Sequence, residues 1–148
     1  MVELSINVDS AVKYFEQIAG NLEGGFRAGF ERIAIQILAT VQRKLSGEVL
    51  NIRSGKLFRS ATSRVEETGD SISAIVEAGA LAPYGRVHEY GWSGTIPEHM
   101  SASRLGKAFL VKAHEAKFPE RSFMRTSLQE NEAAILQILN DLVTKAVA

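Results

Sequence analysis

The chain has 148 residues, 45% of them hydrophobic and 23% charged, which is enough for one domain with a hydrophobic core. The 17 Lys and Arg residues balance 17 Asp and Glu residues, which argues against a protein that mainly coats DNA or an anionic membrane. No cysteine is present, so disulfides, thiolate metal sites and cysteine nucleophiles are excluded. Since neither a membrane-length apolar run nor a secretory signal is found, we expect synthesis in a cytoplasm.

The N-terminal region predicts a strand and two helices. Apolar and polar residues alternate over 2–8, which predicts a strand with one buried face, followed by a short helix over 10–20. Adjacent glycines predict a break over 21–25. Apolar residues then recur at steps of three and four, which predicts a long amphipathic helix over 26–46 that ends at Gly47.

The middle of the chain predicts a hairpin between two short helical segments. Residues 48–61 predict a loop with one or two helical turns. Two alternating runs, 62–68 and 71–78, flank Gly69-Asp70, a connection typical of a β-hairpin. A short helix is expected over 84–90.

The remaining chain predicts a loop over 92–105, a strand over 108–113 and a final helix over about 122–146. The fold class is therefore α+β, with a small, mostly antiparallel sheet packed against the long helix (about 26–46) and the C-terminal helix. We expect a single domain over 1–148. Its predicted core takes apolar residues from the first strand and both long helices: Val2, Leu4, Ile6, Phe30, Ile33, Ile37, Val41, Ile135, Ile138 and Leu142.

Residue patterns typical of catalysis are missing from the sequence. His88, His99 and His114 are too far apart to form a metal-binding pair on a helix. No glycine-flanked nucleophilic serine and no phosphate-binding glycine loop occurs. We therefore predict no enzyme activity, no catalytic residue, no metal and no cofactor.

A short basic segment leaves two interpretations open. Four cations lie close together, and they are able either to contact DNA phosphates or to form an ordinary solvated face beside neighbouring acidic residues. The chain as a whole lacks the basic excess of most nucleic-acid-binding domains, which favours the second interpretation. The cations are Arg53, Lys56, Arg59 and Arg64, and the acids are Glu66, Glu67 and Asp70.

Residues 92–118 form a candidate assembly loop. The stretch is long for a connection in a compact domain, and it carries large apolar side chains of the kind enriched at protein interfaces. Packing on its own domain is the alternative interpretation. Its basic residues are able to meet acidic residues of a neighbour: Arg104, Lys107 and Lys112. The interface candidates are Trp92, Leu105, Phe109, Leu110 and Val111.

Three short motifs occur in a characteristic order. NIRSGKL over 51–57 precedes the predicted hairpin, YGRVHEYG over 84–91 follows it, and PERSFM over 119–124 opens the last helix. Together they resemble the tail-component family of long-tailed phages, the gene-product-ten-like neck or tail-completion proteins, across roughly 25–145. One difference is Ser122, which stands where the family usually has proline and is itself suited to cap the helix.

The resemblance implies a structural virion protein of the head–tail junction. Such a protein would be made in the host cytoplasm and form a ring, expected to hold six copies. The ring would join a head-closure or adaptor protein to the tail terminator or tail tube and let double-stranded DNA pass without sequence specificity. No membrane partner and no cofactor are implied. A tail terminator or minor tail subunit is the alternative, and a small DNA-binding protein is a more distant one.

Structural roles are expected for the motif residues. Tyr84, Val87 and Tyr90 share one face of the short helix and are expected to dock it on the sheet. Glu89 is expected to pair with an arginine such as Arg121 or Arg125. The residues to which the resemblance assigns structural roles are Ser54, Gly55, Leu57, Tyr84, Glu89, Gly91, Arg121 and Phe123.

Overall fold

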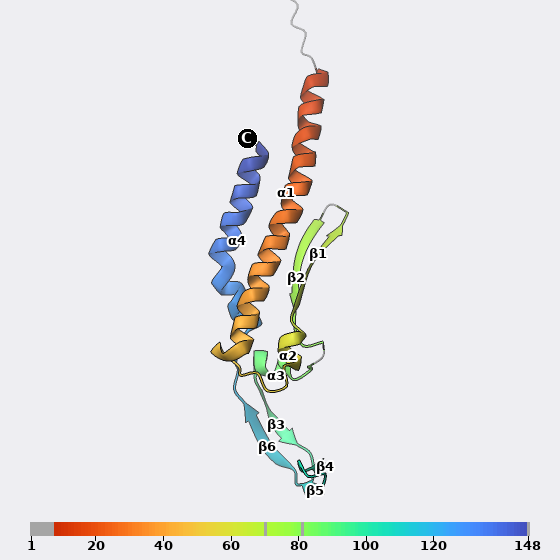
Figure 1. Ribbon diagram of the computed structural model, residues 1–148, viewed down its shortest axis with the longest axis vertical. Coiled ribbons are helices and arrows are strands. Elements are labelled where there is room, and N and C mark those ends of the chain that lie inside the picture. The colour runs from red at the N-terminus through yellow and green to blue at the C-terminus, as the bar shows by residue number, and fades with distance from the viewer. Residues whose placement is uncertain (1–7, 70, 81, 148) are drawn as a thin grey trace, which may run out of the picture.

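The computed structural model describes residues 8–69, 71–80 and 82–147 (Figure 1). Two long helices, α1 (Val8–Arg43) and α4 (Met124–Val147), lie side by side and form a body. A β-hairpin packs along α1, and a second β-ribbon projects beyond the C-terminal end of α1. The predicted α+β class is confirmed. None of the described helices combines the length and apolar character needed to cross a membrane.

The N-terminal region forms one uninterrupted helix instead of two. Helix α1 continues through Gly24 and Gly25, so the predicted break over 21–25 is wrong. The predicted strand over 2–8 lies outside the described residues, except for Val8, which begins α1.

Close packing against α4 accounts for a further glycine inside α1, Gly29. A Cβ atom on Gly29 would lie 2.2 Å from Cδ1 of Leu142, so the missing side chain lets α4 approach α1 closely. Glycine inside a helix costs only about 1 kcal/mol relative to alanine, and burial of an apolar face along α1 outweighs that cost. The helix passes into a π-helical turn, Lys44–Glu48, where Gly47 has a φ of 145° and ends the helix as predicted.

The predicted hairpin is confirmed. Strands β1 (Thr62–Thr68) and β2 (Ser71–Glu77) pair antiparallel, and Gly69 in the connection has a φ of 56°. Ala74 and Val76 lie on one face of β2 and pack against the hydrophobic core. The hairpin therefore lies against α1 through its half-buried face and leaves the other face in solvent.

Two short helices flank the hairpin in sequence. Helix α2 (Lys56–Arg59) follows Gly55, whose φ is 69°. Helix α3 (Gly85–Tyr90) ends at Gly91, whose φ is 70°, as the sequence predicts. Both glycines have positive φ angles that other residues rarely adopt.

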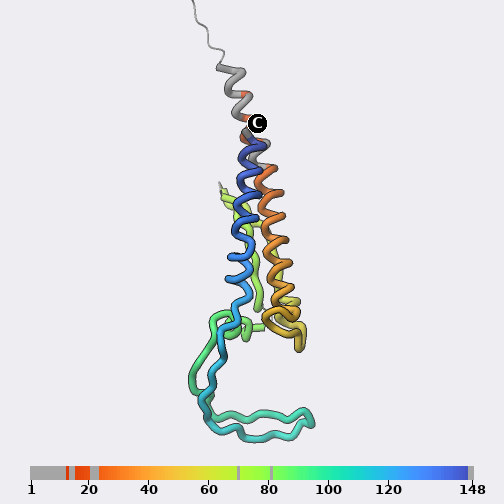
Figure 2. Tube along the Cα trace, turned by 90° about the vertical axis from the view of Figure 1, so that its left-hand side faces the viewer, coloured from red at the N-terminus to blue at the C-terminus, as the bar shows by residue number. Residues whose placement is uncertain are grey.

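The second ribbon, residues 92–118, is called the arm. Strand β3 (Trp92–Ile96) pairs with β6 (His114–Phe118), and β4 (His99–Ala102) pairs with β5 (Ala108–Val111), all antiparallel. The two pairs follow one another along a single double-stranded ribbon. Figure 2 shows that the ribbon leaves the body and then bends, so that its tip lies to one side of the helices.

The arm corrects one prediction and confirms part of another. Residues 92–105 were expected to form a loop, but most of them belong to β3 and β4. Neither face of these strands is buried, so the sequence carries none of the apolar–polar alternation that burial produces. The strand predicted over 108–113 is present as β5, which ends at Val111.

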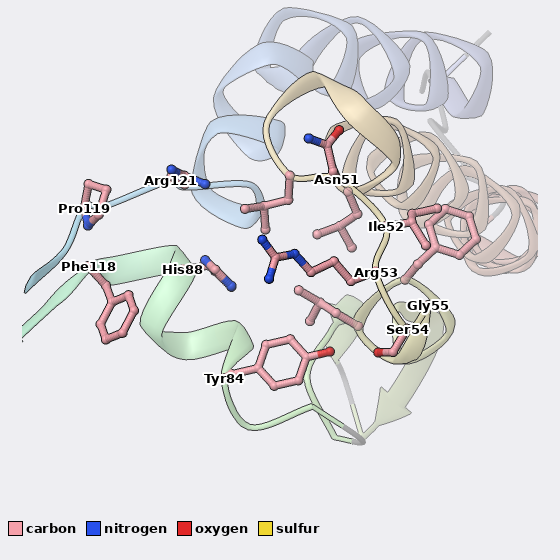
Figure 3. Close-up of a pocket in the computed structure, with 14 residues that line it drawn as sticks. Asn51, Ile52, Arg53, Ser54, Gly55, Tyr84, His88, Phe118, Pro119 and Arg121 are labelled. Atoms are coloured by element: carbon pink, nitrogen blue, oxygen red, sulfur yellow. The ribbon is translucent and has the colours of Figure 1, made fainter. Parts of the chain in front are cut away.

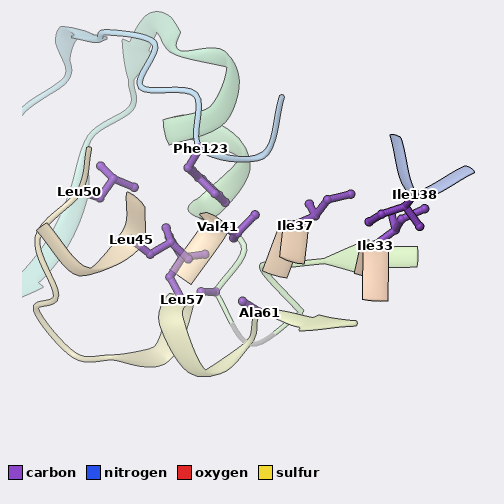
Figure 4. Packing of buried hydrophobic residues seen from close by; sticks show 10 residues of the cluster. Ile33, Ile37, Val41, Leu45, Leu50, Leu57, Ala61, Phe123 and Ile138 are labelled. Carbon is purple, nitrogen blue, oxygen red and sulfur yellow. The ribbon is translucent and has the colours of Figure 1, made fainter. Parts of the chain in front are cut away.

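The hydrophobic core lies between α1, α4, α2 and the turn after α1 (Figure 4). Of the predicted core residues, Ile33, Ile37, Val41 and Ile138 are buried. Three more are partly buried: Phe30, Ile135 and Leu142. Val2, Leu4 and Ile6 lie outside the described residues. Leu57 and Phe123, which were expected to have structural roles, are also buried. Four further buried core residues were not among the predicted core residues: Leu45, Leu50, Ala61 and Ala82.

Polar side chains fix the register of α1 against α4. Asn131 is buried, accepts a hydrogen bond from Nε2 of Gln36 at 2.9 Å and donates one to Oγ1 of Thr40 at 2.9 Å. Lys44 is also buried, and its Nζ lies 2.8 Å from Oε1 of Glu130. These contacts satisfy the buried polar groups and select one alignment of the two helices.

Candidate functional site

The three motif segments meet where the arm joins the body. A Cβ atom on Gly85 would lie 2.8 Å from Cδ1 of Leu57, so the second motif packs closely on the first. The backbone N–H of Arg121 donates to the carbonyl oxygen of His88 at 2.7 Å, which ties the third motif to the second. Segments far apart in the sequence therefore form one junction.

Glu89 is the centre of this junction. Its side chain is buried and accepts four hydrogen bonds from the start of α4. Oε1 accepts from Oγ of Ser122 at 2.7 Å and from N of Arg125 at 3.0 Å. Oε2 accepts from N of Phe123 at 2.8 Å and from N of Met124 at 2.9 Å. One carboxylate thus caps an entire helix N-terminus, where its charge also meets the favourable end of the helix dipole.

The same contacts determine the protonation state of Glu89. Burial alone would raise the pKa of this carboxyl group. The hydrogen bonds from Met124, Ser122, Arg125 and Phe123 act in the other direction and lower the pKa below its usual value. Glu89 is therefore ionised at neutral pH in the folded protein.

Two predictions about this junction are wrong. Glu89 was expected to pair with an arginine side chain, but it binds the backbone N–H of Arg125, while the guanidinium group of Arg125 pairs with Glu120. The hydroxyl of Ser122 was expected to cap α4, but it donates to Glu89 instead. A cap contributed by a residue more than thirty positions away leaves no local sequence signal.

The face of α3 that docks on the body also differs from the prediction. Tyr84 and Tyr90 are 42% and 65% exposed, and Val87 is only partly buried. The buried positions are Gly85 and Glu89, one helical turn apart. Neither a glycine nor a glutamate counts as an apolar position in a helical pattern. The apolar periodicity of the sequence therefore marks the opposite face, which carries the tyrosines.

The other motif residues have structural roles at the same place. Leu57 and Phe123 are buried, and Phe123 is among the largest side chains fully removed from solvent. Ser54 accepts a long hydrogen bond, 3.4 Å, from the N–H of Lys56 at the start of α2. A Cβ atom on Gly91 would approach backbone atoms to 2.9 Å, so the chain passes from α3 into the arm at a point where only glycine fits.

The arm presents apolar side chains to solvent. Not one of residues 92–118 is buried. Leu105 is 87% exposed, and the ring of Trp92 lies tilted beside that of Phe118 across the ribbon, with ring centroids 6.0 Å apart. The predicted interface candidates all lie on this ribbon; Trp92, Leu105, Phe109 and Leu110 are exposed, and Val111 is partly exposed.

Two of the four cations of the basic segment have partners within the chain. Arg64 pairs with Glu66 at 2.6 Å and with Glu77 at 2.8 Å. Arg59 donates to the carbonyl oxygen of Ser54. The acidic side chain of Glu66 therefore neutralises part of the segment, in agreement with the solvated-face interpretation.

Comparisons with known proteins add no relative: no protein-family model, no curated protein and no solved structure matches the chain. Within the described residues, no group of three or more His, Asp or Glu side chains is arranged to hold a metal ion. The candidate site is therefore defined by geometry alone, as an exposed β-arm on a firmly capped junction.

Proposed function

We propose that this chain is a structural protein of the phage head–tail junction, a neck or tail-completion protein that assembles into a ring. The observation that carries the proposal is the arm, a ribbon that exposes Leu105, Phe109 and Leu110 while contributing nothing to the core. Large contiguous apolar patches are uncommon on monomeric proteins and often mark contacts with another protein. The order of the three motifs supplies the link to the tail-component family.

The junction supports this role because it gives the arm a firm base. The arm leaves the body at Gly91 and returns at Pro119, on either side of the Glu89 cap. Glu89 lies in α3, immediately before the arm, and binds the start of α4, immediately after it. The cap therefore holds the two ends of the arm together. An arm with a fixed base would set the orientation of the neighbouring subunit that it contacts.

The proposed mechanism is assembly, in which no covalent bond forms or breaks. Apolar side chains of the arm would be buried against neighbouring subunits, at roughly 25 cal/mol for each Å² removed from water. Heterologous contacts of this kind close into rings when the rotation between subunits permits. DNA contacts in the channel would be weak and independent of sequence, because the DNA has to slide.

A matched pair of substitutions tests the role of the arm. Leu110 on the arm and Leu136 on α4 are 53% and 56% exposed. We expect the purified protein to form rings in electron microscopy and light scattering, Leu110→Asp to abolish them, and Leu136→Asp to leave them intact. A protein that stays monomeric near 0.1 mM, about the range of weak specific association, would refute the ring. Equal effects of the two substitutions would refute the arm as the contact.

Hydrogen exchange gives a second measurement. We expect amides over 95–115 to exchange rapidly in the free subunit, because a two-stranded ribbon without a buried face opens easily, and slowly in assembled particles, where neighbours would hold it closed. Strong protection of these amides in a free monomer would contradict the proposal.

A further inference from the structure

A cleft of about 570 Å³ opens beside the junction, and the proposed function does not use it. Figure 3 shows Arg53 reaching into the cleft toward His88 of α3, with Arg121, from the segment before α4, on the same side. The other walls are mainly apolar and come from Leu45, Leu50, Ile52, Phe58, Tyr84 and Phe118.

No ion pair among the described residues neutralises the positive charge in the cleft. Within the described chain, neither Arg53 nor Arg121 forms an ion pair with a carboxylate. Burial lowers the pKa of His88, and the charges of Arg121 and Arg53 lower it further. At neutral pH the cleft therefore combines two guanidinium groups with a neutral imidazole.

We infer that this cleft binds an acidic segment of a partner protein, with Arg53 and Arg121 holding a carboxylate and the apolar walls holding a neighbouring apolar side chain. Guanidinium groups bind carboxylates through paired, charge-assisted hydrogen bonds. An apolar concavity with a few convergent polar groups is the usual form of a binding pocket.

The composition of the walls favours a protein segment over nucleic acid. A sugar–phosphate backbone offers phosphate oxygens but little apolar surface to place beside Ile52, Tyr84 and Phe118, which are 51%, 42% and 44% exposed. A glutamate or aspartate next to a phenylalanine or leucine satisfies both parts of the cleft. The inference does not depend on ring formation.

The test uses the full chain and NMR signals of the His88 ring. The probes are the blocked dipeptides N-acetyl-Phe-Glu-amide, N-acetyl-Phe-Gln-amide and N-acetyl-Gly-Glu-amide, together with inorganic phosphate. We expect N-acetyl-Phe-Glu-amide to bind most tightly and to raise the pKa of His88, because a bound carboxylate offsets the two arginine charges.

Substitutions identify the residues that bind the carboxylate. Arg53→Gln and Arg121→Gln are each expected to weaken binding by about tenfold, the loss typical of one charge-assisted hydrogen bond. Arg86→Gln is the matched control, because Arg86 lies on α3 but lines a different, smaller hollow. Backbone NMR spectra of each variant check that the fold is intact.

Three results would overturn the inference. The first is no movement of the His88 signals at probe concentrations of about 50 mM, beyond the weak-binding range. The second is equal binding of the Glu and Gln dipeptides, which would show that the carboxylate is not recognised. The third is tighter binding of phosphate than of N-acetyl-Phe-Glu-amide, which would assign the cleft to phosphate groups such as those of DNA.

Discussion

Removing the carboxylate of Glu89 is expected to destabilise the protein more than removal of any exposed acid. In Glu89→Ala, four donors at the start of α4 lose their acceptor. The N–H of Phe123 is buried, and leaving it unsatisfied costs about 1–3 kcal/mol. Water can reach the other donors in part, so their loss resembles removal of an ordinary helix cap, about 1 kcal/mol. The free energy of unfolding should therefore fall by about 2–4 kcal/mol.

Urea unfolding followed by circular dichroism measures this change. Glu89→Gln should lose more than half as much as Glu89→Ala, because the amide keeps one acceptor oxygen but turns an NH₂ group toward backbone donors. Glu132→Ala on the exposed surface of α4 is the control and should change stability by less than about 0.5 kcal/mol. A loss below about 0.5 kcal/mol in Glu89→Ala would refute the reasoning, since a buried cap with four partners cannot be that weak.

Other predictions concern the core, the helix glycines and pH. Ile37→Ala should reduce the free energy of unfolding by about 2–5 kcal/mol, and a loss below 0.5 kcal/mol would show that the buried face of α1 is wrongly assigned. Gly24→Ala should raise the free energy of unfolding by about 0.5–1 kcal/mol, because the space around Gly24 is open. Gly29→Ala should raise it less or lower it, because the new methyl group would meet Leu142, and Leu142→Ala in the same chain should remove that clash. Because folding lowers the pKa of Glu89, its contribution is complete above the unfolded pKa, about 4.3, and is lost as pH falls through the folded pKa. Acid titration of stability in the wild type and in Glu89→Gln tests this, and equal acid sensitivity of the two proteins would contradict it.

The sequence predicts those parts of the fold that are determined by contacts between residues close together in the chain. The hairpin around Gly69 and the short helix ending at Gly91 were predicted with nearly correct ends, because turn chemistry acts over a few residues. The buried faces of both long helices follow from apolar periodicity, which marks Ile37 and Ile138. The α+β class needs no more information than this.

The errors arise where a distant segment decides the outcome. Gly24 and Gly25 predict a break by local propensity, but α1 continues through them into a part of the helix that buries its apolar face against α4. The strands of the arm lack alternation because, in the part of the chain that the structure describes, neither face of the ribbon is buried. From the sequence alone, Glu89 is expected to form an ion pair with an arginine. Its actual partners lie at the start of α4, more than thirty residues away in the chain.

The Glu89 cap also holds the segment that leads into α4. Ser122 donates its hydroxyl to Oε1 of Glu89 at 2.7 Å, and this hydrogen bond ties the residues before α4 to α3. The junction thus depends on holding the start of α4 against α3. Because the arm lies between these two helices in the sequence, whatever fixes the start of α4 also fixes both ends of the arm.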